Sequence, residues 1–191
     1  MKFHVPAFIC KKFSLYKVIK NPEISKAIVL SEKEINEYVI ERFDEVKKGK
    51  IKDLVSFQAM NKYMLMAHSQ EELKKLGNIV ASYKKNSFEG IIEEYEKYLK
   101  IALEKEPTVK THSNVLLHIF GYFSKDFSQY EKEQFFKLLD EFREDKITIG
   151  NILVQINPMV YRFNKTYLAS QTYFLLYADP QPGNLFSMLS K

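Results

Sequence analysis

Apolar residues along most of this chain recur every three or four positions, the spacing that places them on one face of an α-helix. Between residues 31 and 46 these apolar residues are Ile35, Tyr38, Val39 and Phe43. The preceding Ser31-Glu32-Lys33-Glu34 is typical of a helix start in which the serine and the second glutamate each satisfy a backbone N–H group. The pattern therefore predicts a helix that begins at Ser31 and ends before the lysine-rich turn.

The same spacing predicts a succession of helices from residue 53 to residue 177. Their starts carry side chains that favour the N-cap position, namely Asp53, Ser69, Ser128 and Thr148. Asn157-Pro158 predicts a kink or a break in one of them. The predicted helices cover residues 31–48, 53–68, 69–85, 88–105, 108–126, 128–142, 148–160 and 166–177.

The helix at residues 108–126 organises this prediction, because it is apolar around most of its circumference and carries one narrow polar stripe. The stripe is mostly uncharged, which favours a helix surrounded by others, with the stripe bonded to neighbouring elements or to a ligand. We expect Gly121 within the stripe to allow close helix packing. At 100° per residue, the following residues fall within about 100° of one another. They are Thr111, Asn114, His118, Gly121, Tyr122 and Lys125.

The composition agrees with a single helical domain. The chain has 191 residues, of which 46% are hydrophobic, and this is enough to bury a core within one domain. Only 6 glycines and 6 prolines leave few turn residues for an all-β fold. We predict an all-α protein, a single compact bundle of about seven or eight helices within residues 31–180. An N-terminal arm, residues 1–30, and a C-terminal tail, residues 181–191, would flank the bundle.

The net charge of +5 comes entirely from the N-terminal quarter. Residues 1–52 hold 12 basic and 7 acidic side chains, whereas the remaining residues hold 17 of each. A local basic excess suits a nucleic acid or an anionic membrane, although an ordinary solvated surface explains it as well. The nucleic-acid hypothesis assigns phosphate contacts to Lys47, Lys48, Lys50 and Lys52.

Several classes of function lose support from the sequence. The single cysteine, Cys10, excludes an intramolecular disulfide framework and fits a reducing compartment. No apolar run approaches the roughly 18 residues of a membrane span, and the start lacks the features of a secretory signal. We therefore expect a cytoplasmic protein without a membrane partner. No glycine-rich phosphate loop, serine nucleophile motif or paired-carboxylate signature is present, and we expect no cofactor.

The histidines do not have the spacing of a metal site. His112 and His118 are six residues apart, so they lie about 240° apart around a helix and cannot ligate one ion together. We predict no metal. His68 closes its predicted helix, where a histidine satisfies terminal carbonyls and the helix dipole.

One face of the helix at residues 108–126 has two interpretations that the sequence leaves open. His118, with Tyr122, is the candidate for general acid or base catalysis on a phosphate, carboxylate or base edge, and Lys62 would supply a cation. Alternatively, the His–Asn–Tyr ladder along this face is a buried network that fixes helix packing. The candidate ligand-binding residues are Lys62, His112, Asn114, His118, Tyr122 and Gln171, with Tyr167 beside them.

Three segments resemble the YbgA-like domain, a family of bacterial and archaeal proteins of uncharacterised function. They are FQAMNKYMLMAHS at residues 57–69, HSNVLLHIFGYF at 112–123 and, more weakly, YLASQTYF at 167–174. The similarity extends over about residues 35–180, although family members usually have a histidine where this chain has Gln58. The resemblance implies an all-helical domain. Such domains stand alone or are fused behind a cysteine-bearing domain of the thiouracil-desulfurase type, and free-standing members can be encoded beside a DNA photolyase.

These contexts point to nucleobases or tRNA and leave three hypotheses. The first is a helical module that binds RNA, such as tRNA, or a nucleotide. The second is an enzyme that acts on a nucleobase or a small anionic metabolite. The third is a protein-interaction domain that docks onto a desulfurase-type partner. We do not expect desulfurase activity from this chain alone, because it lacks the several cysteines of an iron–sulfur site.

Overall fold

Every regular element is a helix within residues 30–84, 86–162 and 166–179, the ranges that the computed structural model describes. The predicted arm up to residue 29 and the tail at 181–191 lie outside these ranges. Because α3 to α10 each span seven or more residues, the prediction of an all-α fold with about seven or eight helices is confirmed. The helices are α3 (Glu32–Val46), α4 (Ile51–Met60), α5 (Lys62–His68), α6 (Gln70–Ala81), α7 (Phe88–Leu103), α8 (Val109–Phe123), α9 (Gln129–Arg143), α10 (Ile149–Arg162), α11 (Thr166–Ala169) and α12 (Thr172–Tyr177).

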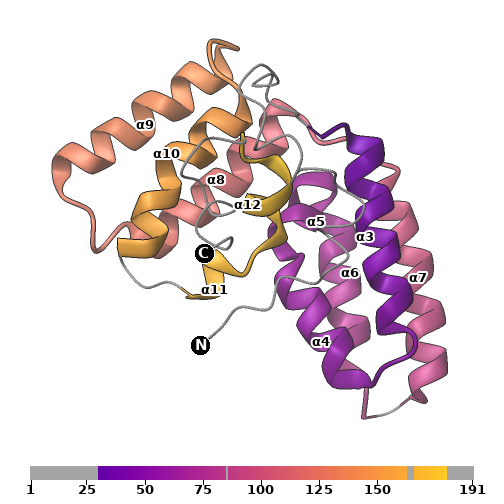
Figure 1. The fold of residues 1–191 in the computed structure, drawn as a ribbon. Helices are drawn as coiled ribbons and strands as arrows, with labels where there is room; N and C mark the ends of the chain where they lie inside the picture. The colour runs from indigo at the N-terminus through magenta and orange to yellow at the C-terminus, as the bar shows by residue number, and fades with distance from the viewer. Residues whose placement is uncertain (1–29, 85, 163–165, 180–191) are drawn as a thin grey trace, which may run out of the picture. The chain divides into compact units, whose positions relative to one another are not determined.

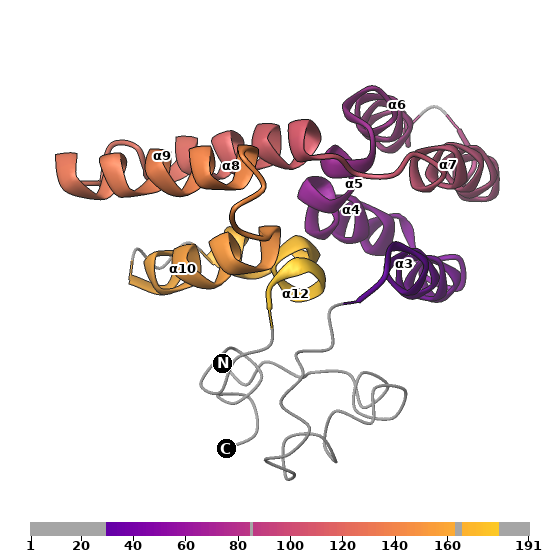
Figure 2. The same cartoon turned by 90° about the horizontal axis from the view of Figure 1, so that it is seen from above.

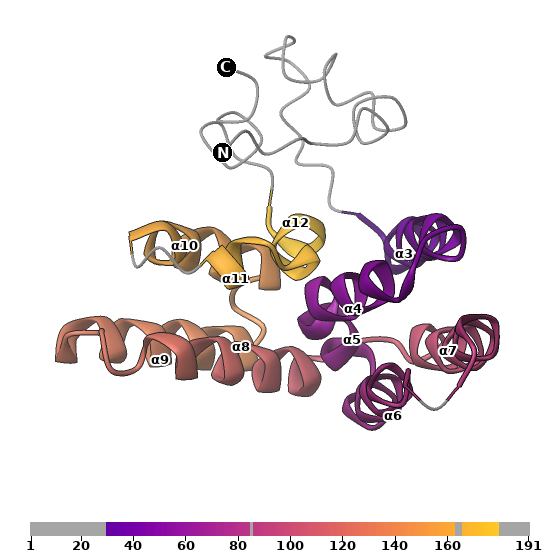
Figure 3. The ribbon, with the colours of Figure 1, turned by 90° about the horizontal axis from the view of Figure 1, so that it is seen from below.

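The innermost element of the unit formed by residues 30–178 is α5. All of its side chains from Tyr63 to His68 are buried, and it contacts α4, α6, α7, α8 and α12. In Figure 1, α3, α4, α6 and α7 lie on one side of α5, and α8, α9 and α10 lie on the other. Figures 2 and 3 show α8 and α9 side by side, with α10 and α12 next to them.

The burial of α5 corrects the expectation that residues 108–126 form a helix surrounded by others. The sequence YMLMAH is apolar around its whole circumference, which is typical of a fully buried helix. By contrast, α8 buries Val115, Leu116 and Ile119 and exposes its opposite side to solvent. The polar stripe of α8 is therefore a surface feature.

A break at Asn61 separates α4 from α5, whereas the sequence pattern predicted one helix over 53–68. The helix also begins earlier than expected, at Ile51, because Asp53 accepts a hydrogen bond of 2.7 Å from the Lys50 N–H group instead of serving as the N-cap. Met60, predicted to be in the core, is 43% exposed. The 100° rule does not extend across a change of helix direction, so it misplaced Met60.

Residues at the start of α12 form hydrogen bonds with groups on both sides of the break between α4 and α5. The Gln171 side chain accepts from the Tyr63 N–H group at 3.4 Å and donates to the Ala59 carbonyl at 2.7 Å. The Thr172 hydroxyl lies 2.7 Å from Oδ1 of Asn61. A helix end that is buried away from water needs such partners, and here they come from a segment more than one hundred positions away.

The predicted N-caps and core positions of several helices are confirmed. Ser31 and Ser128 each form a reciprocal capping box, and Ser69 caps α6 through its hydroxyl. Phe43 and Leu76, which the apolar spacing predicted to face the core, are buried. None of the described helices is long and apolar enough to cross a membrane.

Replacing Gln171 by alanine tests the role of the α12 contact. The substitution leaves the Tyr63 N–H group and the Ala59 carbonyl without partners, so we expect the free energy of unfolding to fall by about 3 kcal/mol. Gln129→Ala, at an exposed position on α9, is the control and should change it by no more than about 0.5 kcal/mol. Urea denaturation measures both, and equal small effects would contradict the role of Gln171.

Candidate functional site

The exposed side of α8, with the side chains that border it, is the candidate site. Thr108 caps the helix by accepting a hydrogen bond of 3.2 Å from the Thr111 N–H group. Burial of Val115, Ile119 and Phe123 against the core then directs the opposite residues to solvent. We call this surface the α8 face. It comprises Lys110, Asn114, Leu117, His118, Tyr122 and Lys125 from α8 and its C-terminal turn, together with Lys62, Arg143 and Tyr167.

The α8 face is positively charged, because residues 109–125 contain no acidic side chain. The first turn of α8 also lacks an acidic residue, whereas the first turns of α3, α6, α7 and α9 each contain one or more. The positive end of the α8 dipole is thus not neutralised by its own side chains. Both features favour an anionic ligand.

An exposed pair of stacked tyrosines lies on this face. The rings of Tyr122 and Tyr167 have centroids 5.8 Å apart and an interplanar angle of 30°, and Tyr122 is 42% exposed. Tyr63 is a buried residue of α5 that lies near Tyr122. Burial raises the pKa of Tyr63, and the neighbouring Tyr122 raises it further. The Lys62 ammonium lies 5.9 Å from the centre of the Tyr63 ring. Tyr63 thus has Lys62 on one side and Tyr122 on the other, and Tyr122 in turn stacks on Tyr167.

His118 shares this face, but it does not belong to a buried ladder. Its side chain is exposed, and its ring has no hydrogen bond among the described residues. The Asn114 amide instead donates to Oε1 of Gln70 at 3.3 Å. Gly121 does not serve close packing, because a Cβ atom there would meet nothing within 4 Å. The ladder and the packing role of Gly121 were wrong for the same reason, since Gly121 and His118 are both exposed and none of the described helices covers them.

Two of the predicted residues lie away from the α8 face. His112 points to the interior, where its Nδ1 atom is 2.7 Å from the Tyr173 hydroxyl and its ring packs edge-on to Tyr177 at 5.0 Å. The separation of His112 from His118 follows from their 240° spacing. Gln171 is 2% exposed, and its amide already bonds to α4 and α5.

A second buried histidine lies near His112. The Nδ1–H group of His68 donates to the Lys105 carbonyl at 2.8 Å, so His68 caps the end of the neighbouring α7 and not its own helix. The Tyr177 hydroxyl donates to Glu32 at 3.0 Å and lies 3.5 Å from Nε2 of His68. Burial lowers the pKa of His68 and raises the pKa of Glu32, so the interior disfavours charge on both groups. We call these residues, with His112 and Tyr173, the buried polar cluster.

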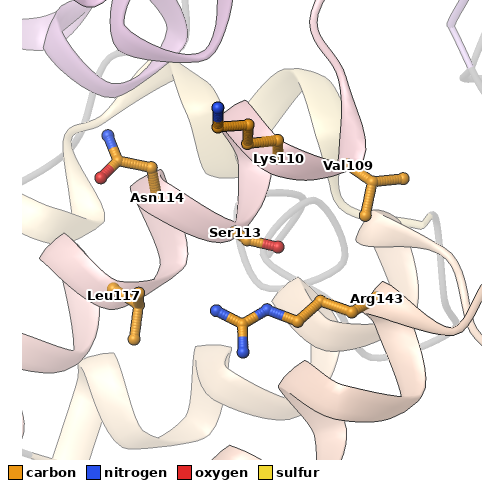
Figure 4. Close-up of a pocket in the computed structure, with 6 residues that line it drawn as sticks. All are labelled: Val109, Lys110, Ser113, Asn114, Leu117 and Arg143. Atoms are coloured by element: carbon orange, nitrogen blue, oxygen red, sulfur yellow. The ribbon is translucent and has the colours of Figure 1, made fainter.

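A groove runs between the N-terminal half of α8 and the end of α9 (Figure 4). Its volume is about 470 Å³, and its lining includes two cations, a hydroxyl group and an amide. Only Asn114 among the lining residues is a candidate from sequence, because the groove depends on where α9 ends relative to α8. The lining residues are Val109, Lys110, Ser113, Asn114, Leu117 and Arg143.

The lysines assigned to phosphate contacts lie around the turn between α3 and α4, and they differ in whether a carboxylate pairs with them. Lys47 forms ion pairs with Asp44 at 2.9 Å and Glu96 at 2.7 Å. Burial lowers the pKa of Lys47, but the two carboxylates outweigh this effect and the net shift is upward. Lys48, Lys50 and Lys52 are exposed and have no ion pair within the described residues. Nowhere in the described part of the chain do three His, Cys, Asp or Glu side chains converge in a metal-binding arrangement.

The buried polar cluster makes stability depend on pH. Burial, and secondarily the nearby His68, lower the pKa of His112 from 6.5 to about 4. Above pH 6.5 the ring is neutral in both the folded and the unfolded chain, so the full stability is present. As the pH falls toward 4, only the unfolded chain takes up the proton, and we expect His112 to cost about 3 kcal/mol of unfolding free energy.

The comparison of wild type with His112→Phe isolates this contribution, because the carboxylates titrate in both proteins. Urea denaturation between pH 7 and pH 4 should show a loss of stability in the wild type that exceeds the loss in the variant by about 3 kcal/mol. Parallel losses in the two proteins would show that His112 does not titrate as the structure requires.

Comparison with known proteins identifies the family. A sequence model of the family described as "Protein of unknown function (DUF1722)" matches residues 62–178. The uncharacterized protein YbgA of Escherichia coli (strain K12) is 27% identical over 125 residues, which are 65% of this chain and 74% of that protein. No solved structure matches the chain. Because the family model matches more than half of its length, the chain belongs to the DUF1722 family of unknown function, and its resemblance to the YbgA-like domain is confirmed.

Proposed function

We propose that this domain is a cytoplasmic RNA-binding module that contacts single-stranded RNA, such as the loops of tRNA, through the α8 face. The observation that carries the proposal is the exposed Tyr122–Tyr167 stack beside α8, whose residues 109–125 include no acidic side chain. Unpaired bases of RNA stack on exposed aromatic rings, and this contact tolerates any base. A base adding to the outer face of Tyr122 would continue a stack that the protein has already begun.

The cations around the tyrosine pair suit the phosphates on either side of a stacked base. The Lys62 ammonium lies over the ring of Tyr63, and Lys125 follows α8 by two residues. Lys110 and Arg143 border the other end of the face. Cations that track a strand on both sides of an aromatic platform are typical of proteins that bind single-stranded nucleic acid.

The turn between α3 and α4 would add a second, purely electrostatic contact. Lys48, Lys50 and Lys52 are exposed and available for phosphates, whereas Lys47 is held by two carboxylates. Such contacts contribute affinity without base recognition, and they weaken as salt concentration rises.

Replacing Tyr122 by alanine tests the stacking contact. We expect binding of bulk tRNA to weaken at least about fivefold, because a base stacked on an aromatic ring contributes about 1–3 kcal/mol. Tyr83→Ala is a matched control, since Tyr83 is also 42% exposed but follows α6. Fluorescence anisotropy measures both affinities, with duplex DNA as a competitor. Equal affinities of the two variants would refute a role for the tyrosine pair.

A salt series separates the two sets of cations. Lys62→Ala should reduce the slope of log affinity against log salt concentration by about one, the loss of one phosphate contact. Lys97→Ala, on the exposed side of α7, should leave this slope unchanged. If the turn between α3 and α4 also binds RNA, the joint replacement of Lys48, Lys50 and Lys52 by alanine should reduce the slope by up to about three. Absence of tRNA binding by the wild-type protein even at low salt would overturn the proposed function.

A further inference from the structure

The groove between α8 and α9 contains a polar group that the protein does not satisfy. Ser113 is 5% exposed, and its hydroxyl group has no hydrogen-bond partner among the described residues. A serine within a helix commonly bonds to the carbonyl four residues earlier, but Ser113 does not. Leaving a buried hydroxyl unpaired destabilises a protein, so its retention at the wall of a groove points to a ligand that pairs with it.

Two cations border the same groove from different helices. Arg143 extends from α9 toward α8 and lies below Ser113 in Figure 4, while Lys110 lies one helical turn before Ser113 at the rim. The contact of Arg143 with Asp140 is 3.4 Å long and exposed, so it holds the guanidinium group only weakly. Lys110 has no ion pair within the described residues, and its exposed side chain can turn toward a ligand. Within the part of the chain that the structure describes, no acidic side chain lines the groove.

The remaining lining matches the other parts of a nucleotide. Val109 and Leu117 are exposed apolar side chains on either side of Ser113, and they offer contact to a base or a sugar. The Asn114 amide supplies hydrogen-bonding groups at the rim. The groove also opens beside the first turns of α8, whose dipole is not neutralised by an acidic residue.

We propose that this groove binds a phosphate monoester, with Arg143 and Lys110 neutralising its two charges and the Ser113 hydroxyl donating to a phosphate oxygen. Two cations match a dianionic monoester better than the single charge of an internal phosphodiester, and the guanidinium fork fits two of its oxygens. A free nucleoside monophosphate and the terminal phosphate of an RNA strand present the same group. The inference goes beyond the proposed function, because a free nucleotide would occupy the groove even if RNA did not bind the α8 face.

Titration calorimetry with adenosine 5′-monophosphate and adenosine tests the free-nucleotide source. A short RNA with a 5′-phosphate and the same RNA with a 5′-hydroxyl group test the terminal source. We expect at least one phosphorylated probe to bind about tenfold more tightly than its unphosphorylated counterpart, the effect of one lost charge-assisted hydrogen bond. Equal binding within both pairs, or no binding of any phosphorylated probe, overturns the proposal.

Variants assign the effect to the groove. Arg143→Gln should weaken the phosphorylated probe about tenfold and leave the unphosphorylated one unchanged. Arg42→Gln, at an arginine of α3 that is paired with Glu45, is the matched control and should have no effect on either probe. Equal affinity of the wild-type protein and Arg143→Gln for the phosphorylated probe would contradict the assignment.

Ser113→Ala distinguishes a ligand-binding serine from a structural one. Because the Ser113 hydroxyl has no partner to lose and alanine favours a helix, the melting temperature should stay the same or rise. Affinity for the phosphorylated probe should fall at the same time. A lower melting temperature with unchanged affinity would show that Ser113 serves the fold alone and would contradict its role in the groove.

Discussion

The whole arrangement depends on burying α5, a seven-residue helix, on every side. A helix this short has few internal hydrogen bonds and many terminal backbone groups, and each of these groups needs a partner once water is excluded. At one end, Gln171 bonds to both sides of the break at Asn61. At the other end, Ser69 caps α6 and His68 bonds to the Lys105 carbonyl. The fold is thus closed by side chains that act on backbone groups.

The position of α5 determines which side of α8 is available. Since Val115, Leu116 and Ile119 pack in the core, the opposite side of α8, with His118 and Tyr122, is exposed among the described helices. The link between core and surface is Tyr63, which belongs to α5 and lies near Tyr122. A surface built directly on the most buried element is well held in place, which suits a preformed platform for stacking.

Much of the fold could be predicted because its signals are local. Ser31, Ser69 and Ser128 mark helix starts through bonds that span three residues, and the 3.6-residue period identified most of the core. The break at Asn61 was missed, because it depends on a partner 111 residues away, Thr172. Sequence alone also misjudged α8 as an interior helix, since uncharged polar residues look alike whether a neighbour or solvent covers them.

The candidate site was predictable to the same extent. Helical spacing correctly placed His118 and Tyr122 on one face and separated His112 from them, as the contact of His112 with Tyr173 shows. The stacking partner Tyr167 and the groove residue Arg143 come from other helices, so their positions required the tertiary structure. No spacing rule within a single helix could have found Ser113 opposite Arg143.

The most direct test of RNA binding through the α8 face is to map the contact itself. Ultraviolet crosslinking of bound tRNA, followed by mass spectrometry of the crosslinked peptides, reports which side chains stack on bases. We expect crosslinks at Tyr122 or Tyr167, which disappear when competitor tRNA is added. Specific crosslinks confined to other surfaces, with none on α8 or at Tyr167, would contradict it.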